Sequence, residues 1–473
     1  MSLPSVPSLP SYEELAAENA QLKTVLGQAL ARIAELEARL GMTSKNSGKP
    51  PSSDGLAKPA PKSLRQRSGR GPGRPKGQPG TTLRQVEDPD HEVTHEPGVC
   101  CGCGAGLEGA DLAGVERRQV FDLPPLHLEV TEHRLVSRRC GCGRVTKAPA
   151  PAGVGSPVQY GSRLAGIGVY LLHGQFLSIS RTVQALSDLF GVRVAAGTVV
   201  GWTRRRIAQA VAVTLDVVRA RLRTAGVVHF DETGLRVAGK LHWMHSASTP
   251  TDVLLTVHPR RGVKGMDAAG VLPGFTGVAV HDAWGPYDTY KDATHALCNA
   301  HAVRELVYVV DTAPEALGVL AGQAIDAMVA IKDLLDTATA NASVPDAKSI
   351  SKAITAQQHL LRSALVLART ATKTRATKLE AKYHALFDRL LARWDDYQRC
   401  VTNPAVPWDN NPAEQTIRMP KLRTKVSGCL RTLTGAEQFA AIRSYITTAA
   451  RNGHNMLDAL IQAADGHPWI HAT

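Results

Sequence analysis

Apolar residues recur every seven positions near the start of the chain, in two adjacent rows. The rows are Leu15, Leu22, Ala29 and Leu36, and Asn19, Leu26, Ile33 and Leu40. A seven-residue repeat is typical of a coiled-coil seam, in which a polar residue such as Asn19 fixes the register. Pro10 and Gly41 bracket the segment. The pattern predicts a helix over residues 12–40 that self-associates; the alternative is a helix packed on its own protein.

Residues 158–225 have the apolar spacing of helices. In SRTVQALSDLFGV we expect an amphipathic helix with Ser180 as its N-cap and Gly191 at its end. The sequence AAGTVVGWTRRRI begins a second helix, which carries Arg204 and Arg205. Two helices joined by a short glycine turn resemble a helix-turn-helix, whose second helix binds DNA. An ordinary helical hairpin, common in all-α regions, explains the same pattern.

Residues 226–310 change from helical spacing to short apolar runs. Three strands are predicted from VVHFDETGLRV, KLHWMHSAS and DVLLTVHP, a short helix from KGMDAAGVL, a fourth strand from GVAVHDAWGPY and a helix from HALCNAHAVRELVYVV. The order βββαβα is that of a ribonuclease-H-like core. We expect residues 311–400 to be helical and 405–430 to be loop-like, with a helical pattern resuming from Gly435.

Charge is concentrated in one stretch of the chain. The formal net charge is +13, and residues 45–86 alone contain ten basic side chains and one acidic one. This stretch is rich in Pro, Gly and Ser, so we expect it to be disordered. A basic disordered arm suits a polyanion, because each neutralised phosphate releases counterions. Arg74 and Lys76 lie in a sequence that resembles a minor-groove hook; the alternative is a solubilising linker.

Composition excludes several classes of protein. Apolar residues make up 43% of the chain, which rules out a wholly disordered protein. No apolar run approaches the roughly 18 residues of a membrane span. The N-terminus has neither a basic head nor an apolar core, so a secretory signal is not expected. These features predict a soluble cytoplasmic protein.

Five of the eight cysteines lie between residues 100 and 142. In a cytosolic protein this density favours a metal site over disulfides. Two knuckles followed by glycine supply four thiolates, which would give a closed structural zinc site in a ribbon. The expected ligands are Cys100, Cys103, Cys140 and Cys142. The spacing also allows Cys101 in place of Cys100, or the entry of His95 or His133, so the identity of the fourth ligand stays open.

Three acidic residues are candidate ligands of Mg²⁺. Asp231 and Asp282 each end an apolar strand, and in a ribonuclease-H-like sheet those two strands are adjacent, so the carboxylates would converge. Glu414 lies in the first turn of a helix begun by Asn411-Pro412. Carboxylates are the ligands that Mg²⁺ prefers, and two such ions can catalyse phosphodiester cleavage. Each acid alone could be a turn or cap residue.

Several neighbours of these acids bear on the same site. Glu232 is the main rival of Asp231, but strand alternation places its side chain on the other face. A phosphate track is predicted from Arg418, Lys421, Arg423 and Lys425. His301 and Arg304 fall one turn apart on a helix after Asp282 and could reach phosphate; placement on the surface is the alternative.

Four motifs of the chain resemble the insertion-sequence sixty-six family of bacterial DDE transposases. They are FDETGLRV, HDAWGPY, CNAHAVREL and WDNNPAEQTIR. The resemblance covers nearly the whole chain. It implies a ribonuclease-H-like fold with a helical insertion before the last acid, and catalysis with Mg²⁺ (or Mn²⁺) by a triad that carries over to Asp231, Asp282 and Glu414. It also implies recognition of terminal inverted repeats and a need for accessory proteins of the same element.

The sequence therefore predicts a multidomain α/β protein with seven regions. They are a coiled coil at 1–44, a basic disordered linker at 45–90, a zinc ribbon at 91–150, a helix-turn-helix-like region at 151–225, a first part of the catalytic core at 226–310, a helical insertion at 311–400 and a C-terminal catalytic part at 401–473.

The predicted activity is Mg²⁺-dependent cleavage and strand transfer of DNA at the ends of an insertion sequence. The expected partners are double-stranded DNA and, through the coiled coil, further copies of the chain, associated with the bacterial nucleoid. One alternative is a non-catalytic zinc-containing DNA-binding regulator, which would leave the three acids unexplained. Another is a structure-specific nuclease that only hydrolyses DNA.

Overall fold

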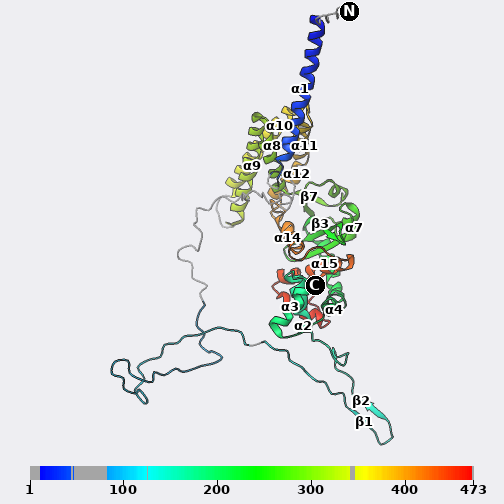
Figure 1. Ribbon diagram of the computed structural model, residues 1–473. Helices are drawn as coiled ribbons and strands as arrows, with labels where there is room; N and C mark the ends of the chain where they lie inside the picture. Colours follow the sequence, from blue (N-terminus) through cyan, green and yellow to red (C-terminus); the bar gives the residue numbers. More distant parts are fainter. Residues whose placement is uncertain (1–10, 44–45, 47–82, 125, 341–346, 471–473) are drawn as a thin grey trace, which may run out of the picture.

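The computed structural model describes residues 11–43, 46, 83–124, 126–340 and 347–470 (Figure 1). Most of the basic linker expected at 45–90 lies outside these residues, and so do Arg74 and Lys76. No helix within the described ranges has the length and apolar character needed to cross a membrane.

The N-terminal helix forms where the heptads predict it. Helix α1 spans Tyr12–Leu40 and begins in a capping box, in which Ser11 and Glu14 exchange side-chain and backbone hydrogen bonds. Its apolar residues are exposed, for example Leu22 at 61% and Leu26 at 59%. Only its last turn packs on the rest of the chain, through the buried Ala38 (Figure 1).

The cysteine-rich segment contains little regular structure. Strands β1 (Ser137–Arg139) and β2 (Val145–Lys147) form an antiparallel hairpin around the second knuckle. A zinc ribbon would need longer strands between the knuckles, but no strand forms in QVFDLP or in most of LEVTEHRLVSRRC. Residues such as Val120 and Val130 stay more than 80% exposed, so these runs have no apolar surface on which to pack.

The helical region expected at 158–225 is present. It comprises α2 (Ser162–Val169), a π-helical turn (Tyr170–Gly174), α3 (Ile179–Phe190), α4 (Ala196–Gly201), a second π-helical turn (Trp202–Ile207), α5 (Ala208–Ala210) and α6 (Ala212–Thr224). Gly191 ends α3 with φ of +66°, as predicted. The N-cap is Ser178, not Ser180, because the Ser178 hydroxyl accepts the hydrogen bond from the Arg181 N–H. Apolar residues of this region pack against α15 and α16.

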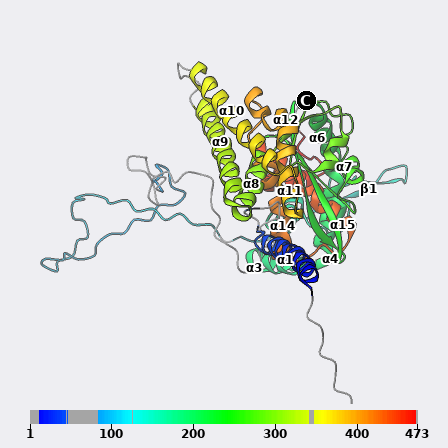
Figure 2. The ribbon, with the colours of Figure 1, turned by 90° about the horizontal axis from the view of Figure 1, so that it is seen from above.

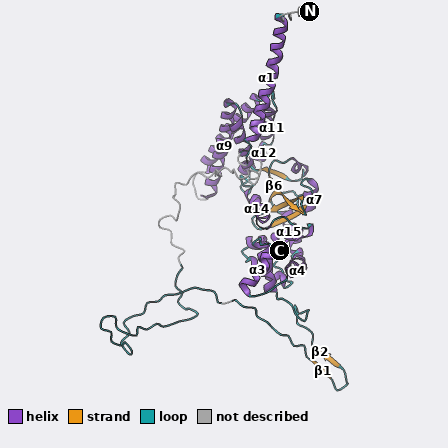
Figure 3. Cartoon of the chain, viewed as in Figure 1, coloured by secondary structure: helices purple, strands orange, loops and turns teal. Residues whose placement is uncertain are grey.

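A mixed five-stranded sheet lies at the centre of the chain (Figure 3). Its elements are β3 (Val227–Val237), β4 (Lys240–Ser248), β5 (Val253–His258), α7 (Val263–Ala269), β6 (Val278–His281), the 3-10 turn η4 (Gly285–Thr289), β7 (Thr294–Leu297) and α8 (Asn299–Thr312). The strand order is β5-β4-β3-β6-β7, with β3 antiparallel to β4 and parallel to β6. The four predicted strands form. Strand β7 was not predicted, because three of its four residues were assigned to the start of the following helix.

The two faces of the sheet are covered by different helices. Val228 and Phe230 pack toward α6 and α7, with Leu222 and Met266 in the same cluster. Alternate residues of the strands, among them Leu235 and Leu255, pack on the other side against Phe439 and Ala440 of α15. A residue's parity along β3 therefore decides which layer its side chain enters.

The rest of the chain is helical. It comprises α9 (Glu315–Ala340), α10 (Ala347–Ala371), α11 (Lys378–Ala392), α12 (Trp394–Tyr397), α13 (Arg399–Thr402), α14 (Asn411–Ser427), α15 (Leu433–Arg451) and α16 (Met456–Ala464). Helices α9 and α10 lie away from α7, on the other side of the molecule (Figure 2). The expectation of a loop over 405–430 is wrong for α14. Pro420 disfavours a helix locally, but burial of Ala413 and Ile417 holds it.

Candidate active site

The sheet places Asp231 and Asp282 on adjacent strands, although only Asp282 follows the end of its strand. The expectation that Asp231 ends a strand is wrong, because β3 continues to Val237 through its pairing with β4. Strands β3 and β6 are adjacent and parallel, and the last pair in their register is His229 with Val280. Asp231 and Asp282 each follow two residues later, so they continue the same row on the same side of the sheet. This is the adjacency that the sequence predicts for the two strands.

Asp231 is a buried carboxyl group with no positive partner among the causes that shift its pKa. Burial raises its pKa to about 8, and the charges of Glu232, Asp282 and Glu414 add to the increase. One hydrogen bond, donated by the Glu232 N–H to the Asp231 Oδ1 at 2.8 Å, acts in the opposite direction. The structure thus brings Asp231 within electrostatic reach of both other predicted acids.

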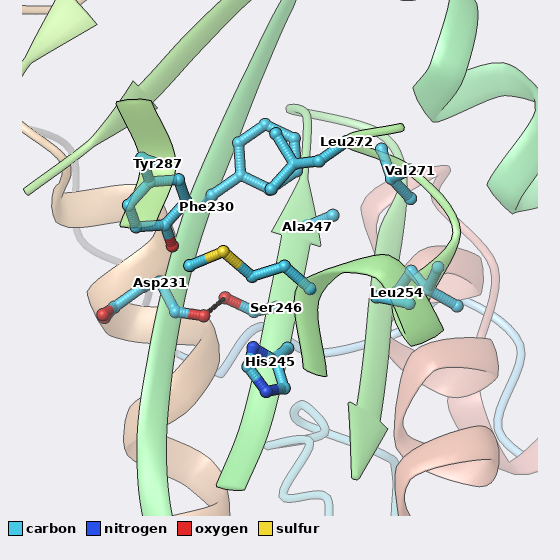
Figure 4. A pocket seen from close by; sticks show the side chains of 11 residues that line it. Phe230, Asp231, His245, Ser246, Ala247, Leu254, Val271, Leu272 and Tyr287 are labelled. Atoms are coloured by element: carbon cyan, nitrogen blue, oxygen red, sulfur yellow. Dashed lines mark hydrogen bonds between the residues drawn. The ribbon is translucent and has the colours of Figure 1, made fainter. Parts of the chain in front are cut away.

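The surroundings of Asp231 differ between its two sides. Figure 4 shows it beside Ser246 of β4, whose hydroxyl donates to the Asp231 carbonyl oxygen at 3.2 Å. The neighbouring pocket is lined largely by apolar side chains, including Phe230, Leu254 and Leu272. Such an apolar lining does not suit a phosphate.

Glu414 reaches this edge because the start of α14 is fixed to β3. The Asn410 side chain donates from Nδ2 to the Phe230 carbonyl oxygen at 2.8 Å and accepts from the His229 ring at 2.8 Å. The Asn410 N–H donates to the Cys298 sulfur at 3.2 Å. Helix α14 begins at the next residue, as predicted, and Glu414 lies in its first turn.

His301 and Arg304 of α8 are directed at Glu414. The His301 Nε2 lies 3.7 Å and an Arg304 terminal nitrogen 3.6 Å from the same oxygen, Oε1 of Glu414. These distances are too long for hydrogen bonds, and within the described residues that buried oxygen has no hydrogen-bond partner. Burial and Arg304 lower the pKa of His301 to about 4, so its ring is neutral at pH 7. Both side chains are half-buried, with 24% of the His301 side chain and 32% of the Arg304 side chain exposed.

Glu232, the rival of Asp231, is on the opposite face and fully engaged. Arg261 donates two hydrogen bonds to its Oε1, at 2.7 and 2.9 Å, and the Tyr287 hydroxyl donates to its Oε2 at 2.8 Å. The Arg261 guanidinium in turn lies 3.8 Å from the centre of the Trp284 ring. Neither was identified as a site residue from the sequence: Arg261 lies outside the four motifs, and Tyr287, which ends HDAWGPY, was not assigned a role.

The acids suit a divalent cation in chemistry and charge. The three carboxylates are hard oxygen donors, the raised pKa of Asp231 reports an excess of negative charge, and Glu414 has an enclosed oxygen free to bind. Among the residues that the structure covers, however, no three His, Cys, Asp or Glu side chains are already grouped at metal-binding distance. Binding therefore requires the carboxylates to move closer together.

The predicted phosphate contacts lie in different environments. Arg418 and Lys425 are exposed on α14, Lys421 is half-buried, and Arg423 is half-buried against Phe439. On the second π-helical turn Arg204 and Arg205 are exposed. The next arginine of that run, Arg206, instead donates to the Ala464 and Tyr160 carbonyl oxygens.

The two cysteine knuckles share one geometry. In the first, the Cys100 N–H donates to the Ala105 carbonyl oxygen at 2.8 Å, and in the second the Cys140 N–H donates to the Arg144 carbonyl oxygen at 2.8 Å. In each, a glycine with positive φ closes the turn. Backbone N–H groups lower the pKa of Cys100 and of Cys140. The knuckles are not assembled into one four-thiolate cluster in the described ranges. Cys101, His95 and His133 are all exposed.

Comparison with known families gave three matches. The family described as "Transposase IS66 family" matches residues 157–438, which is more than half of the chain. The "zinc-finger binding domain of transposase IS66" matches residues 97–143, and a family of unknown function matches residues 1–84. No curated protein matches the chain.

The raised pKa of Asp231 predicts a pH-dependent stability. The folded chain holds this proton more tightly than the unfolded chain, so stability falls as pH rises from 3.8 toward about 8. Asp231→Asn removes the free-energy cost of ionising this buried carboxyl group. We expect its melting temperature to match wild type near pH 4 and to exceed it at pH 9, by at least about 1 kcal/mol of stability. Thermal unfolding across this range measures the difference.

The exposed Asp292→Asn serves as the control for loss of one acid. It should melt like wild type at every pH. If the melting temperatures of Asp231→Asn and wild type differ by the same amount at every pH, the raised pKa of Asp231 is contradicted.

Proposed function

The chain belongs to the IS66 family of transposases, which are DDE enzymes, and on that basis we propose that it cleaves DNA at the terminal inverted repeats of an insertion sequence and joins the released 3′ ends to target DNA. The observation that carries the proposal is the acidic edge of the sheet. There Asp231 lies within β3, Asp282 directly follows the adjacent strand β6, and Glu414 approaches from α14, so that three acids act on one another. Because the family is catalytic, the non-catalytic regulator is not retained.

We propose that the catalytic core is ribonuclease-H-like. The strand order β5-β4-β3-β6-β7 places the first strand of the core, β3, at the centre of the sheet. Strand β4 is antiparallel to both of its neighbours, β3 and β5. Helices α9 to α13 separate α8 from α14 in sequence, which suits an insertion at 311–400 before the last acid. The region at 226–310 and the part at 401–473 then form the two halves of the core.

Asp231, Asp282 and Glu414 would hold Mg²⁺ or Mn²⁺. When bound, the cations supply activation of the attacking oxygen and stabilisation of the leaving oxygen of the phosphodiester. Arg304 compensates part of the charge of Glu414 and leaves its guanidinium available to the substrate phosphate. Neutral His301 adds no further positive charge beside Glu414. The same site first cleaves the element end and then presents the 3′-hydroxyl to target DNA.

The DNA backbone is proposed to follow the basic side chains of α14, namely Arg418, Lys421, Arg423 and Lys425. Arg204 and Arg205 are exposed on the helix-turn-helix-like region at 151–225, where they can contact phosphates without giving up a protein partner. Arg74 and Lys76 belong to this proposal on charge alone. Action on DNA in a bacterial cell places the protein in the cytoplasm at the nucleoid, together with accessory proteins of the same element.

The knuckle residues Cys100, Cys103, Cys140 and Cys142 are proposed to bind one structural zinc ion. Their matched turns, each with backbone N–H groups directed at the first sulfur, support this assignment. Self-association through α1 is supported by the exposure of its apolar seam.

The first test concerns catalysis. We expect Asp231→Asn and Glu414→Gln each to reduce cleavage and strand transfer in vitro by on the order of a thousandfold or more, because each removes a metal-binding oxygen. The assay uses a duplex that carries the inverted repeat, with Mg²⁺. Asp292→Asn should remain active. Full activity in either active-site variant would refute the triad, and hydrolysis without joining would assign the chain to the nucleases.

The second test concerns zinc. Purified protein should contain about one zinc ion per chain. Cys103→Ser should lose the metal. Cys429→Ser should retain it, because this exposed cysteine belongs to neither knuckle. Elemental analysis of the purified variants decides. Retention of zinc by Cys103→Ser would exclude this knuckle as a ligand.

The third test concerns α1. We expect Leu26→Glu with Ile33→Glu to dissociate the protein to a smaller species, because two charges enter the seam of the coiled coil. Light scattering after size exclusion measures the mass. The matched control is Gln28→Glu with Ala31→Glu, which lies off the two rows. An unchanged mass in the seam variant would mean that α1 does not hold copies together.

A further inference from the structure

Arg443 is a buried cation without a polar partner. It lies on α15 with 5% of its surface exposed, and its Nε is enclosed. It forms no hydrogen bond or ion pair with any residue that the structure describes; its contact is with the Phe176 ring, 5.2 Å away. Two half-buried arginines do have polar partners: Arg389 pairs with Glu305 at 2.8 Å, although its Nε lacks a hydrogen-bond partner, and Arg451 donates to the Thr416 hydroxyl at 3.0 Å.

A second arginine and a histidine lie in the same cluster. The Arg423 guanidinium, on α14, is 5.3 Å from the Phe439 ring, and that ring contacts both Phe176 and His173. Burial, followed by the charges of Arg423 and Arg443, lowers the pKa of His173 to about 3. The histidine is therefore neutral, and both arginines lie close enough to act on it.

This cluster has positive charge and no carboxylate. Burial lowers the pKa of Arg443 to about 10, which still leaves it protonated at neutral pH. A buried charge with no counter-charge is strongly destabilising, and contact with an aromatic ring compensates only part of that cost. Within the part of the chain that the structure describes, neither Arg423 nor Arg443 forms an ion pair, and Arg423 donates one hydrogen bond, to the Gly428 carbonyl oxygen at 3.1 Å. The cluster therefore suits an anion.

We propose that Arg443 and Arg423 bind a phosphate group, supplied by the DNA backbone. A guanidinium presents parallel N–H donors that match the oxygens of a phosphate. Arg423 is half-buried and gives access from solvent, and Arg443 forms the inner wall of the site. This inference depends on the proposed function, since it assumes that DNA lies along α14.

The position of the cluster gives its place on the DNA. Arg423 follows Glu414 by nine positions on α14, or about 14 Å at about 1.5 Å per residue. At about 3.4 Å per nucleotide along a strand, the bound phosphate would lie about four nucleotides from the one that reacts. The site would thus fix how far the end of the element extends into the acidic edge.

Thermal unfolding of the full chain tests the anion site directly. Wild type should melt at a higher temperature in sodium phosphate than in sodium chloride of equal ionic strength and pH. Arg443→Met should lose this difference and, in chloride, should melt above wild type, because it removes an uncompensated buried charge. A structural role for Arg443 would give the opposite shift in chloride. Retention of the phosphate effect in Arg443→Met would overturn the proposal.

Binding of a blunt-ended duplex, measured with EDTA and without divalent cations, identifies the source of the phosphate. Arg443→Met and the less buried Arg423→Met should each weaken binding about tenfold. Each should also reduce the slope of log affinity against log salt by about 0.9, the effect of one phosphate contact. The exposed Arg431→Gln is the control for loss of one positive charge.

The outcomes separate this site from the proposed activity. Arg443→Met could lose the phosphate effect on melting and yet bind DNA as tightly as Arg431→Gln does. That result would assign the site to free phosphate and overturn its role in DNA binding. Because the binding assay needs no cleavage, a chain that fails to cleave but depends on Arg443 for DNA would refute the proposed function and support this site.

Discussion

The buried amide of Asn410 is the contact on which the active-site geometry depends. Glu414 is separated in sequence from β3 and from α8 by the whole helical segment α9 to α13. Asn410 joins the Phe230 carbonyl oxygen and the His229 ring to the residue before α14. Asn299, at the start of α8, similarly donates to the Tyr397 and Trp408 carbonyl oxygens. Since every one of these groups is buried, an unmade bond would be costly, and the chain is held in this register.

Strand β3 separates two carboxylates that are neighbours in sequence. Glu232 enters the layer of α7, where Arg261 and Tyr287 satisfy it. Asp231 enters the opposite layer, where its nearest charges are other acids. Glu232 also contributes to the raised pKa of Asp231. The same pair of residues therefore supplies one acid that is paired within the protein and one acid that is available for the proposed cation, and strand alternation determines which is which.

Local patterns in the sequence predict what local interactions determine. The heptads of α1, the Gly191 terminus and the four longer core strands follow from spacing and turn residues, and the strand adjacency of Asp231 and Asp282 follows from their order. What fails depends on distant partners. Helix α14 forms despite Pro420 because Ile417 is buried, β7 exists because β6 is beside it, and the ion pair between Glu232 and Arg261 joins residues 29 apart. No periodicity encodes such contacts.

Helix α14 joins two sites of opposite unsatisfied charge. Glu414 lies in its first turn, where the helix dipole favours an anion, and Arg423 lies in its last two turns. On the proposals above, the acids would bind a cation and the arginine cluster a phosphate. Each buried group of like charges costs the free protein stability, and a ligand that binds only the folded state would offset that cost. Metal-bound DNA would supply both charges at once, positive at the acids and negative at the arginines. The stability lost at the two ends of α14 would then be recovered together when the DNA is bound in position.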